Sequence, residues 1–212
     1  MATPKETHYF DREDGVDWRR PDPAVLHRHY RDPARLWGEA TPVTLYWLPA
    51  HYRVLRYNPA MRFVLLFRDP AARAWSHWAM NHGRGIEPLG FSDAIRDGRR
   101  RVLERGDHVG LSRHFSYVER GFYARQLKSL MQLFPREQML TLTQTMLSQQ
   151  PDACLRQVTE FLGVAPLPPV APQRLNVSRD DGEAMTAQDA ALLSDLYAED
   201  QAEFTAMTGL TL

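Results

Sequence analysis

Residues 63–67 read Phe-Val-Leu-Leu-Phe and pass directly into Arg-Asp-Pro, and this junction constrains the fold more than any other segment. Five consecutive apolar residues are typical of a strand that is buried on both faces, as in a parallel sheet. Asp69 suits a helix N-cap and Pro70 suits the first helical position. The sequence therefore predicts a buried strand followed at once by a helix.

The predicted helix has one apolar face and a hydroxyl that points away from it. The apolar residues that share this face are Ala71, Ala74, Trp75 and Trp78. Ser76 lies off the face. Arg68 and Ser76 are therefore expected beside a helix N-terminus at the carboxyl edge of a sheet, where free N–H groups and the helix dipole favour an anion such as phosphate.

The rest of the chain predicts further helices and one more strand. The expected elements are helices over 50–57, 91–104 and 116–133, a strand over 138–142, and a last helix that begins at the capping box Thr186-x-x-Asp189. Helices that alternate with buried strands predict an α/β fold with a parallel sheet. Ligands of such sheets bind at the carboxyl ends of the strands, where Arg68 lies. At 212 residues we expect a single domain over 1–212.

Composition excludes several classes of function. The 26 basic and 26 acidic side chains give a formal charge of zero, which argues against a nucleic-acid binder. Cys154 is the only cysteine, so no internal disulfide is possible, and we expect it to be a packing residue. The eight histidines form no metal-binding pattern, so no metal is expected. No apolar run approaches the ~20 residues of a membrane span. The N-terminus carries no signal-peptide pattern, so a cytoplasmic protein without membrane association is predicted.

The segment Arg-Asp-Pro-x-x-Arg-x-x-Ser resembles the 3′-phosphate-binding segment of sulfotransferases that use PAPS (3′-phosphoadenosine 5′-phosphosulfate). Other segments resemble the heparan-sulfate-type branch of this family and its bacterial relatives, in the family's order along nearly the whole chain: 5–18 (KE-x-H…D…G-x-D-W), 38–42 (GE-x-TP), 120–138, 161–164 and 176–178. The resemblance implies a three-layer α/β/α sulfotransferase fold, similar to P-loop kinases, with a central parallel sheet.

The same resemblance implies roles for individual residues. Glu6 takes the place of the general base, and His8 and Asp11 match positions that line the acceptor site and support that base. Arg68 and Ser76 take the place of the residues that hold the cofactor's 3′-phosphate. Two further candidates for cofactor binding are Tyr123 and Arg179. From the residues alone, a surface carboxylate that pairs with Lys5 is the favoured interpretation of Glu6, and packing is the favoured role of Tyr123; the surrounding motif favours the general base for Glu6.

The sequence departs from the family pattern in two places. Some relatives with polysaccharide substrates carry Lys where this chain has Ala40, which argues against a strongly anionic polysaccharide acceptor. Relatives also begin with a strand and a Gly-rich loop that cradles the 5′-phosphosulfate, and no such loop precedes Lys5. Either Met1 is an internal methionine and translation starts ~30 residues earlier, the length of a strand–loop–helix unit, or the chain is a degenerate relative.

The expected activity is transfer of a sulfuryl group from PAPS to a hydroxyl or amine of a carbohydrate or small-molecule acceptor, without a metal. The alternative is a catalytically degenerate binding or interaction module. A nucleotide-dependent kinase of similar topology is the other enzyme class considered, but a Walker-type Lys loop and a clear Mg²⁺ carboxylate are both lacking.

Overall fold

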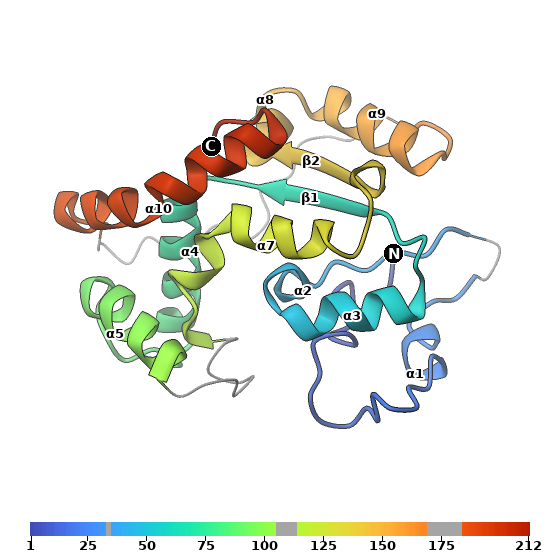
Figure 1. The fold of residues 1–212 in the computed structure, drawn as a ribbon, viewed down its shortest axis with the longest axis horizontal. Coiled ribbons are helices and arrows are strands. Elements are labelled where there is room, and N and C mark those ends of the chain that lie inside the picture. The colour runs from blue at the N-terminus through green and yellow to red at the C-terminus, as the bar shows by residue number, and fades with distance from the viewer. Residues whose placement is uncertain (33–34, 105–113, 169–183) are drawn as a thin grey trace. The chain divides into compact units, whose positions relative to one another are not determined.

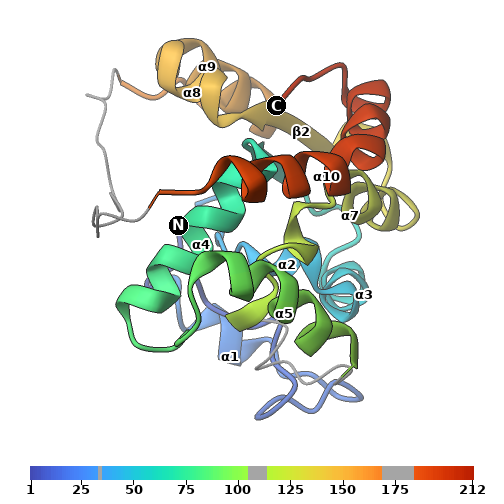
Figure 2. The same ribbon diagram turned by 90° about the vertical axis from the view of Figure 1, so that its left-hand side faces the viewer.

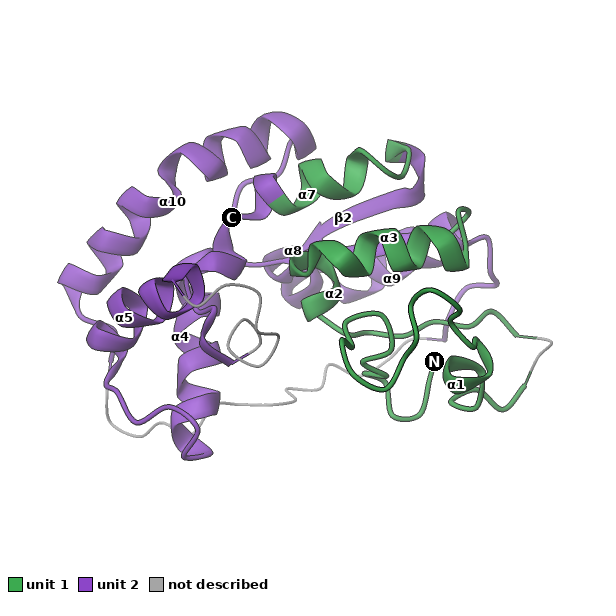
Figure 3. Cartoon of the chain, turned by 60° about the horizontal axis from the view of Figure 1, so that its bottom comes forward, with its two compact units in different colours: residues 1–61, 126–136 green, residues 62–125, 137–212 purple. Residues whose placement is uncertain are grey.

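The computed structural model describes residues 1–32, 35–104, 114–168 and 184–212. These residues form two units, each with its own packing (Figure 3). Unit 1 comprises residues 1–61 and 126–136, and unit 2 comprises residues 62–125 and 137–212. The chain therefore leaves unit 1, returns to it for a short segment, and leaves it again.

The described elements are mostly helices, with one pair of strands (Figure 1). In chain order they are α1 (Ala24–His27), α2 (Val43–Tyr46), α3 (Leu48–Tyr57), β1 (Phe63–Phe67), α4 (Pro70–Gly83), α5 (Phe91–Glu104), the 3₁₀ helix η1 (Glu119–Gly121), α7 (Tyr123–Met131), the 3₁₀ helix η2 (Arg136–Gln138), β2 (Met139–Thr143), α8 (Gln144–Gln149), α9 (Pro151–Leu162) and α10 (Ala187–Thr208).

The two strands lie in unit 2 and pair in parallel, from Phe63 opposite Met139 to Phe67 opposite Thr143. This confirms the two predicted strands and the α/β class, while the three-layer arrangement stays a prediction. The expectation that β1 is buried on both faces is wrong. Phe67 is buried, but Val64 and Leu66 on the opposite face are 41% and 51% exposed. An apolar run shows that a strand can be covered on both faces, but it does not show what covers it.

Helix α4 begins where the sequence places it. Asp69 is the N-cap, and its Oδ1 accepts a hydrogen bond from the Ala72 N–H at 2.6 Å, with Pro70 as the first helical residue. The predicted apolar face is confirmed, because Ala74 and Trp78 are buried in the core of unit 2. Helix α10 crosses this core (Figure 2) and contributes Leu193 and Tyr197, both fully buried. The N-cap half of its predicted capping box is present, since the Thr186 hydroxyl accepts from the Asp189 N–H at 3.1 Å, and the Asp189 carboxylate accepts from that same hydroxyl at 2.7 Å.

The long helix expected over 116–133 is wrong in its first part. The chain forms η1, breaks at Phe122, and starts α7 only at Tyr123. The physical reason lies in α10, where the Asp200 carboxylate accepts hydrogen bonds from the N–H groups of Ala124 at 2.9 Å and Arg125 at 3.1 Å. This side chain caps α7 from a distant part of the sequence and so fixes where the helix begins.

In unit 1, the short helices α2 and α3 pack through Val43, Trp47, Ala50 and Val54, all of which are buried. Cys154 in unit 2 is buried within α9, as expected for a packing residue. Across the described ranges, none of the helices combines the length and the apolar character that crossing a membrane requires.

Candidate functional site

The three candidate catalytic residues of unit 1 form a series of charged and polar contacts. The His8 Nδ1 atom lies 3.1 Å from Oδ2 of Asp11, whose side chain is buried. The His8 Nε2 atom lies 3.8 Å from Oε2 of Glu6, which is an electrostatic contact rather than a hydrogen bond. Lys5 approaches the other oxygen of Glu6 at 3.6 Å. The structure thus brings Glu6, His8 and Asp11 together, with Glu6 and His8 partly open to solvent.

The backbone at His8 is unusual in a way that supports a specialised role. Its φ of +50° lies in the left-handed region, which non-glycine residues rarely adopt. The His8 N–H donates to the Thr41 hydroxyl at 3.3 Å, which ties this conformation to the 38–42 segment. The Lys5 carbonyl also accepts from the Ala40 N–H at 2.8 Å. Strained backbone that neighbouring residues hold in place occurs preferentially at functional sites.

Glu39 is a supporting residue that the sequence interpretation missed. Its Oε2 accepts hydrogen bonds from the hydroxyls of Thr41 and Thr7, the latter at 3.3 Å. Burial raises the pKa of the Glu39 carboxyl, these hydroxyl groups oppose the rise, and the negative charge of Asp11 adds to it. The spacing Glu39-x-Thr41, which places both side chains on one face of an extended segment, is the signal that could have identified the pair.

A second anchor holds the segment that carries Asp11. Nη1 of Arg53 in α3 donates to the carbonyls of Phe10 and Arg12, both at 2.9 Å. Nη2 of the same side chain contacts both carboxylate oxygens of Glu13 at 2.7 Å. Because these carbonyls flank Asp11, Arg53 fixes the backbone on either side of the carboxylate that contacts His8.

The anion-binding candidates lie in unit 2, where β1 leads into α4. Nη2 of Arg68 donates to the Ala72 carbonyl at 2.8 Å. This contact holds the guanidinium against the first turn of α4, one turn before Ser76. Burial lowers the pKa of Arg68, and the nearby positive charge of Arg73 adds to this effect. A bound anion would compensate the cost of burying that charge.

The structure corrects one part of the predicted phosphate site. The first turn of α4 does not present a row of free N–H groups, because Asp69 accepts from the Ala72 N–H and Pro70 has none. The Asp69 carboxylate is also negative and repels an anion at this end of the helix. Any phosphate held here therefore depends on the Arg68 and Ser76 side chains rather than on the helix N-terminus.

Tyr123 lies under this region as a packing residue. It is 5% exposed, and its ring lies 5.0 Å from that of Phe67 between ring centroids. Burial raises the pKa of its hydroxyl, and the positive charges of Arg73 and Arg68 oppose the rise. Arg73 itself donates to the carbonyl of Tyr117, a role that the sequence did not reveal. Arg179, the remaining candidate, falls outside the described residues.

The described ranges contain no cluster of three or more His, Cys, Asp and Glu side chains arranged to hold a metal ion.

The candidate residues of unit 1 and those of unit 2 have complementary chemistry. Unit 1 offers carboxylates and an imidazole that can accept and hold a proton, and unit 2 offers a cation and a hydroxyl that can bind an anion.

Comparison with known proteins gives consistent matches. The sequence model of the family described as "Sulfotransferase family" matches residues 17–169. Heparan sulfate glucosamine 3-O-sulfotransferase 3B1 of Mus musculus is 27% identical over 165 residues, which is 77% of this chain and 39% of that protein. Heparan sulfate glucosamine 3-O-sulfotransferase 3A1 of the same species is 27% identical over 171 residues, with the same shares. The chain thus spans about two fifths of the length of these curated relatives.

A crystal structure of a sulfotransferase from Alicyclobacillus acidocaldarius has the same fold, with a TM-score of 0.78 and 21% identity. The similarity covers 100% of this chain and 85% of the bacterial one. Together with the family match over most of the chain, the fold leads to one assignment: this protein belongs to the sulfotransferase family.

Proposed function

We propose that this protein transfers a sulfuryl group from PAPS to a hydroxyl or amine of a carbohydrate or small-molecule acceptor. The observation that supports the proposal is the half-buried Arg68 guanidinium, which lies against the first turn of α4 directly after the carboxyl end of β1. When bound, PAPS supplies the sulfuryl group, with PAP as its desulfated form. Arg68 and Ser76 would hold the 3′-phosphate, and Tyr123 would support Arg68 from below.

The same proposal assigns the unit 1 residues to the acceptor. Glu6 would remove the acceptor's proton, because it is the more exposed carboxylate of the series. His8 would orient Glu6, and the buried Asp11 would fix the imidazole through its contact with Nδ1. Arg179 is proposed to approach the nucleotide. The relatives named above act on heparan sulfate glucosamine, which supports a carbohydrate acceptor, whereas Ala40 favours one of low charge.

Calorimetric titration with PAP tests the donor site. Arg68→Ala is expected to weaken PAP binding by about tenfold to a hundredfold, because a charge-assisted hydrogen bond is lost. Ser76→Ala is expected to have a smaller effect. Arg84→Ala is the matched control, since this exposed arginine lies at the opposite end of α4. The PAP affinity of this variant should equal that of the wild-type protein. Equal affinity in the wild-type protein and Arg68→Ala would contradict the donor site.

A sulfuryl-transfer assay over sugars, phenols and amines tests the acceptor side. Glu6→Gln is expected to lower the turnover rate by about 10²–10⁴ and to leave PAP affinity unchanged. Glu199→Gln, an exposed carboxylate on α10, is the control. PAP binding without turnover for any acceptor in the wild-type protein would instead favour the degenerate binding module.

A further inference from the structure

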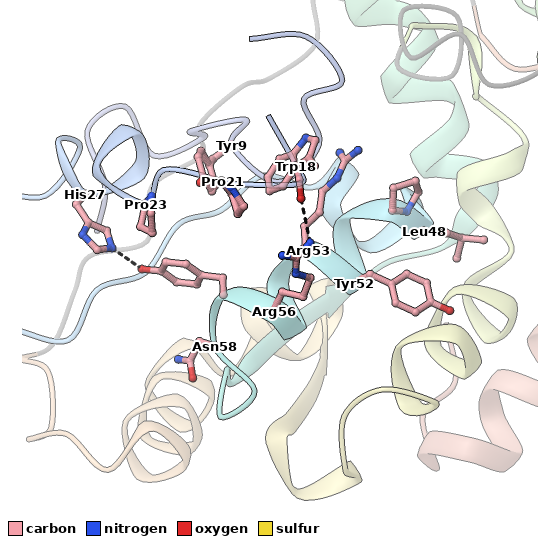
Figure 4. Close-up of a pocket in the computed structure, with 12 residues that line it drawn as sticks. Tyr9, Trp18, Pro21, Pro23, His27, Leu48, Tyr52, Arg53, Arg56 and Asn58 are labelled. Atoms are coloured by element: carbon pink, nitrogen blue, oxygen red, sulfur yellow. Dashed lines mark hydrogen bonds between the residues drawn. The ribbon is translucent and has the colours of Figure 1, made fainter. Parts of the chain in front are cut away.

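Unit 1 contains a pocket that none of the candidate catalytic residues lines. Its volume is about 940 Å³, near the upper end of the ~300–1,000 Å³ typical of small-molecule sites. Much of its wall is aromatic and comes from the 9–27 segment and from α3 (Figure 4). The aromatic residues are Tyr9, Trp18, Tyr52 and Tyr57, and three prolines and Leu48 complete the apolar lining. Such walls suit a flat apolar ring system.

Most polar groups that line this pocket already have partners within the protein. The Tyr9 hydroxyl donates to the Asp22 carbonyl at 3.1 Å, and the Trp18 indole N–H donates to the Arg12 carbonyl at 2.7 Å. The Tyr57 hydroxyl and His27 Nε2 contact each other at 3.0 Å. A sugar needs several hydrogen-bonding partners for its hydroxyl groups, and this lining offers few. The pocket therefore favours an aromatic ligand over a carbohydrate.

The two arginines of the pocket differ in how far their charge is neutralised. The charge of Arg53 is neutralised, because its side chain pairs with both oxygens of Glu13. Its guanidinium also stacks over Trp18 at 4.3 Å from the ring centroid. Arg56, one turn further along α3, donates only to the Trp18 carbonyl, at 2.9 Å. Within the described ranges no carboxylate pairs with Arg56, and its side chain is exposed. Arg56 therefore retains both charge and N–H groups for an anion.

We propose that this pocket binds a planar aromatic compound that carries a carboxylate or sulfate group. The ring system lies against Trp18 and Tyr57, and the anionic group pairs with Arg56. Tyr52, which is 59% exposed, points away from them on the other side of α3 (Figure 4). The site uses none of Glu6, Arg68 and Ser76, so it stands independently of sulfuryl transfer.

The test is calorimetric titration of the full chain with 2-naphthoate, with uncharged 2-naphthamide and with glucuronate. Saturable binding of 2-naphthoate, about tenfold weaker binding of the amide and the weakest binding of glucuronate are expected. Arg56→Gln should weaken 2-naphthoate binding about tenfold, to the level of the amide. Tyr57→Leu should weaken the binding of both naphthyl compounds, because an aromatic wall is lost. Arg28 is an exposed arginine of unit 1 outside the pocket, so Arg28→Gln should leave the affinity for both naphthyl compounds unchanged.

The location is checked on the indole N–H signals of the protein in NMR spectra. The Trp18 signal should move on addition of 2-naphthoate, while those of Trp75 and Trp78 in unit 2 should not. Near-ultraviolet circular dichroism confirms that each variant is folded. The proposal is overturned by absent saturation with 2-naphthoate, by an equal loss in Arg28→Gln, or by tighter binding of glucuronate.

Discussion

Gly121 shows how one missing side chain fixes a buried contact. A Cβ atom at this position would lie 2.5 Å from both Cζ and the hydroxyl of Tyr197. The Tyr197 ring cannot move away easily, because it is fully buried and its hydroxyl donates to the Val118 carbonyl at 2.9 Å. Gly121→Ala is therefore expected to lower the free energy of unfolding by about 1–3 kcal/mol, measured by urea denaturation. Gly38→Ala, which enters open space, is the control, and equal losses in the two variants would disprove the close contact.

Glu39 predicts how stability depends on pH. Burial raises the pKa of this carboxyl above its ordinary value of 4.5, so the folded state holds the proton at pH values where the unfolded state has released it. Stability contributed by the protonated form is then lost as the pH rises through that window. Glu39→Gln removes this loss, so the variant should gain stability relative to wild type as the pH rises above the ordinary carboxyl value of 4.5.

Urea unfolding of both proteins across this range measures the difference, in which all other titrating groups cancel. Glu199→Gln, which replaces a solvated carboxylate, should show a flat difference. A flat difference for Glu39→Gln as well would show that the partial burial of Glu39 does not raise the pKa of its carboxyl.

At the scale of elements, helix α7 depends on a cap from α10. Asp200→Ala removes the carboxylate that accepts from the N–H groups of Ala124 and Arg125, and it should lower the free energy of unfolding by about 1–2 kcal/mol. Asp200→Asn keeps one acceptor oxygen and should lose less. Asp195 is an exposed position on α10, so Asp195→Ala is the matched control when the loss of stability is measured by thermal unfolding. A loss no larger than that of the control would show that α7 does not need this cap.

A comparison of α4 with α7 shows which helices a sequence can predict. The sequence predicts α4 correctly because its cap, its proline and its apolar face all lie within a few consecutive residues. The start of α7 was wrong because its cap lies 76 residues from Ala124. The exposed face of β1 was missed for a related reason, since burial depends on neighbours that are distant in sequence.

In the candidate site too, residues close together in the sequence could be predicted, and contacts between distant residues could not. Glu6, His8 and Asp11 lie within one short segment, so their spacing and their resemblance to a known pattern could be recognised. Glu39 and Arg53 were missed, because they reach that segment through pairings over 32 to 43 residues. The roles of Arg68 and Ser76 stay predictions that PAP titration decides.

At the scale of the whole molecule, the path of the chain couples the two units. Unit 1 is completed only by residues 126–136, which contribute Leu127, Leu130 and Phe134, each at most 2% exposed. A peptide of residues 1–61 lacks these side chains, and a chain of that length buries too little apolar surface to offset its conformational entropy. We expect this peptide to be unfolded, with poorly dispersed amide signals in its NMR spectrum.

The same peptide joined by a flexible Gly/Ser linker to residues 126–136 should gain dispersion and a cooperative thermal transition, because the missing apolar face is restored. The joined chain with Leu127→Asp and Leu130→Asp should remain unfolded, and a dispersed spectrum from residues 1–61 alone would show that unit 1 does not need the returning segment.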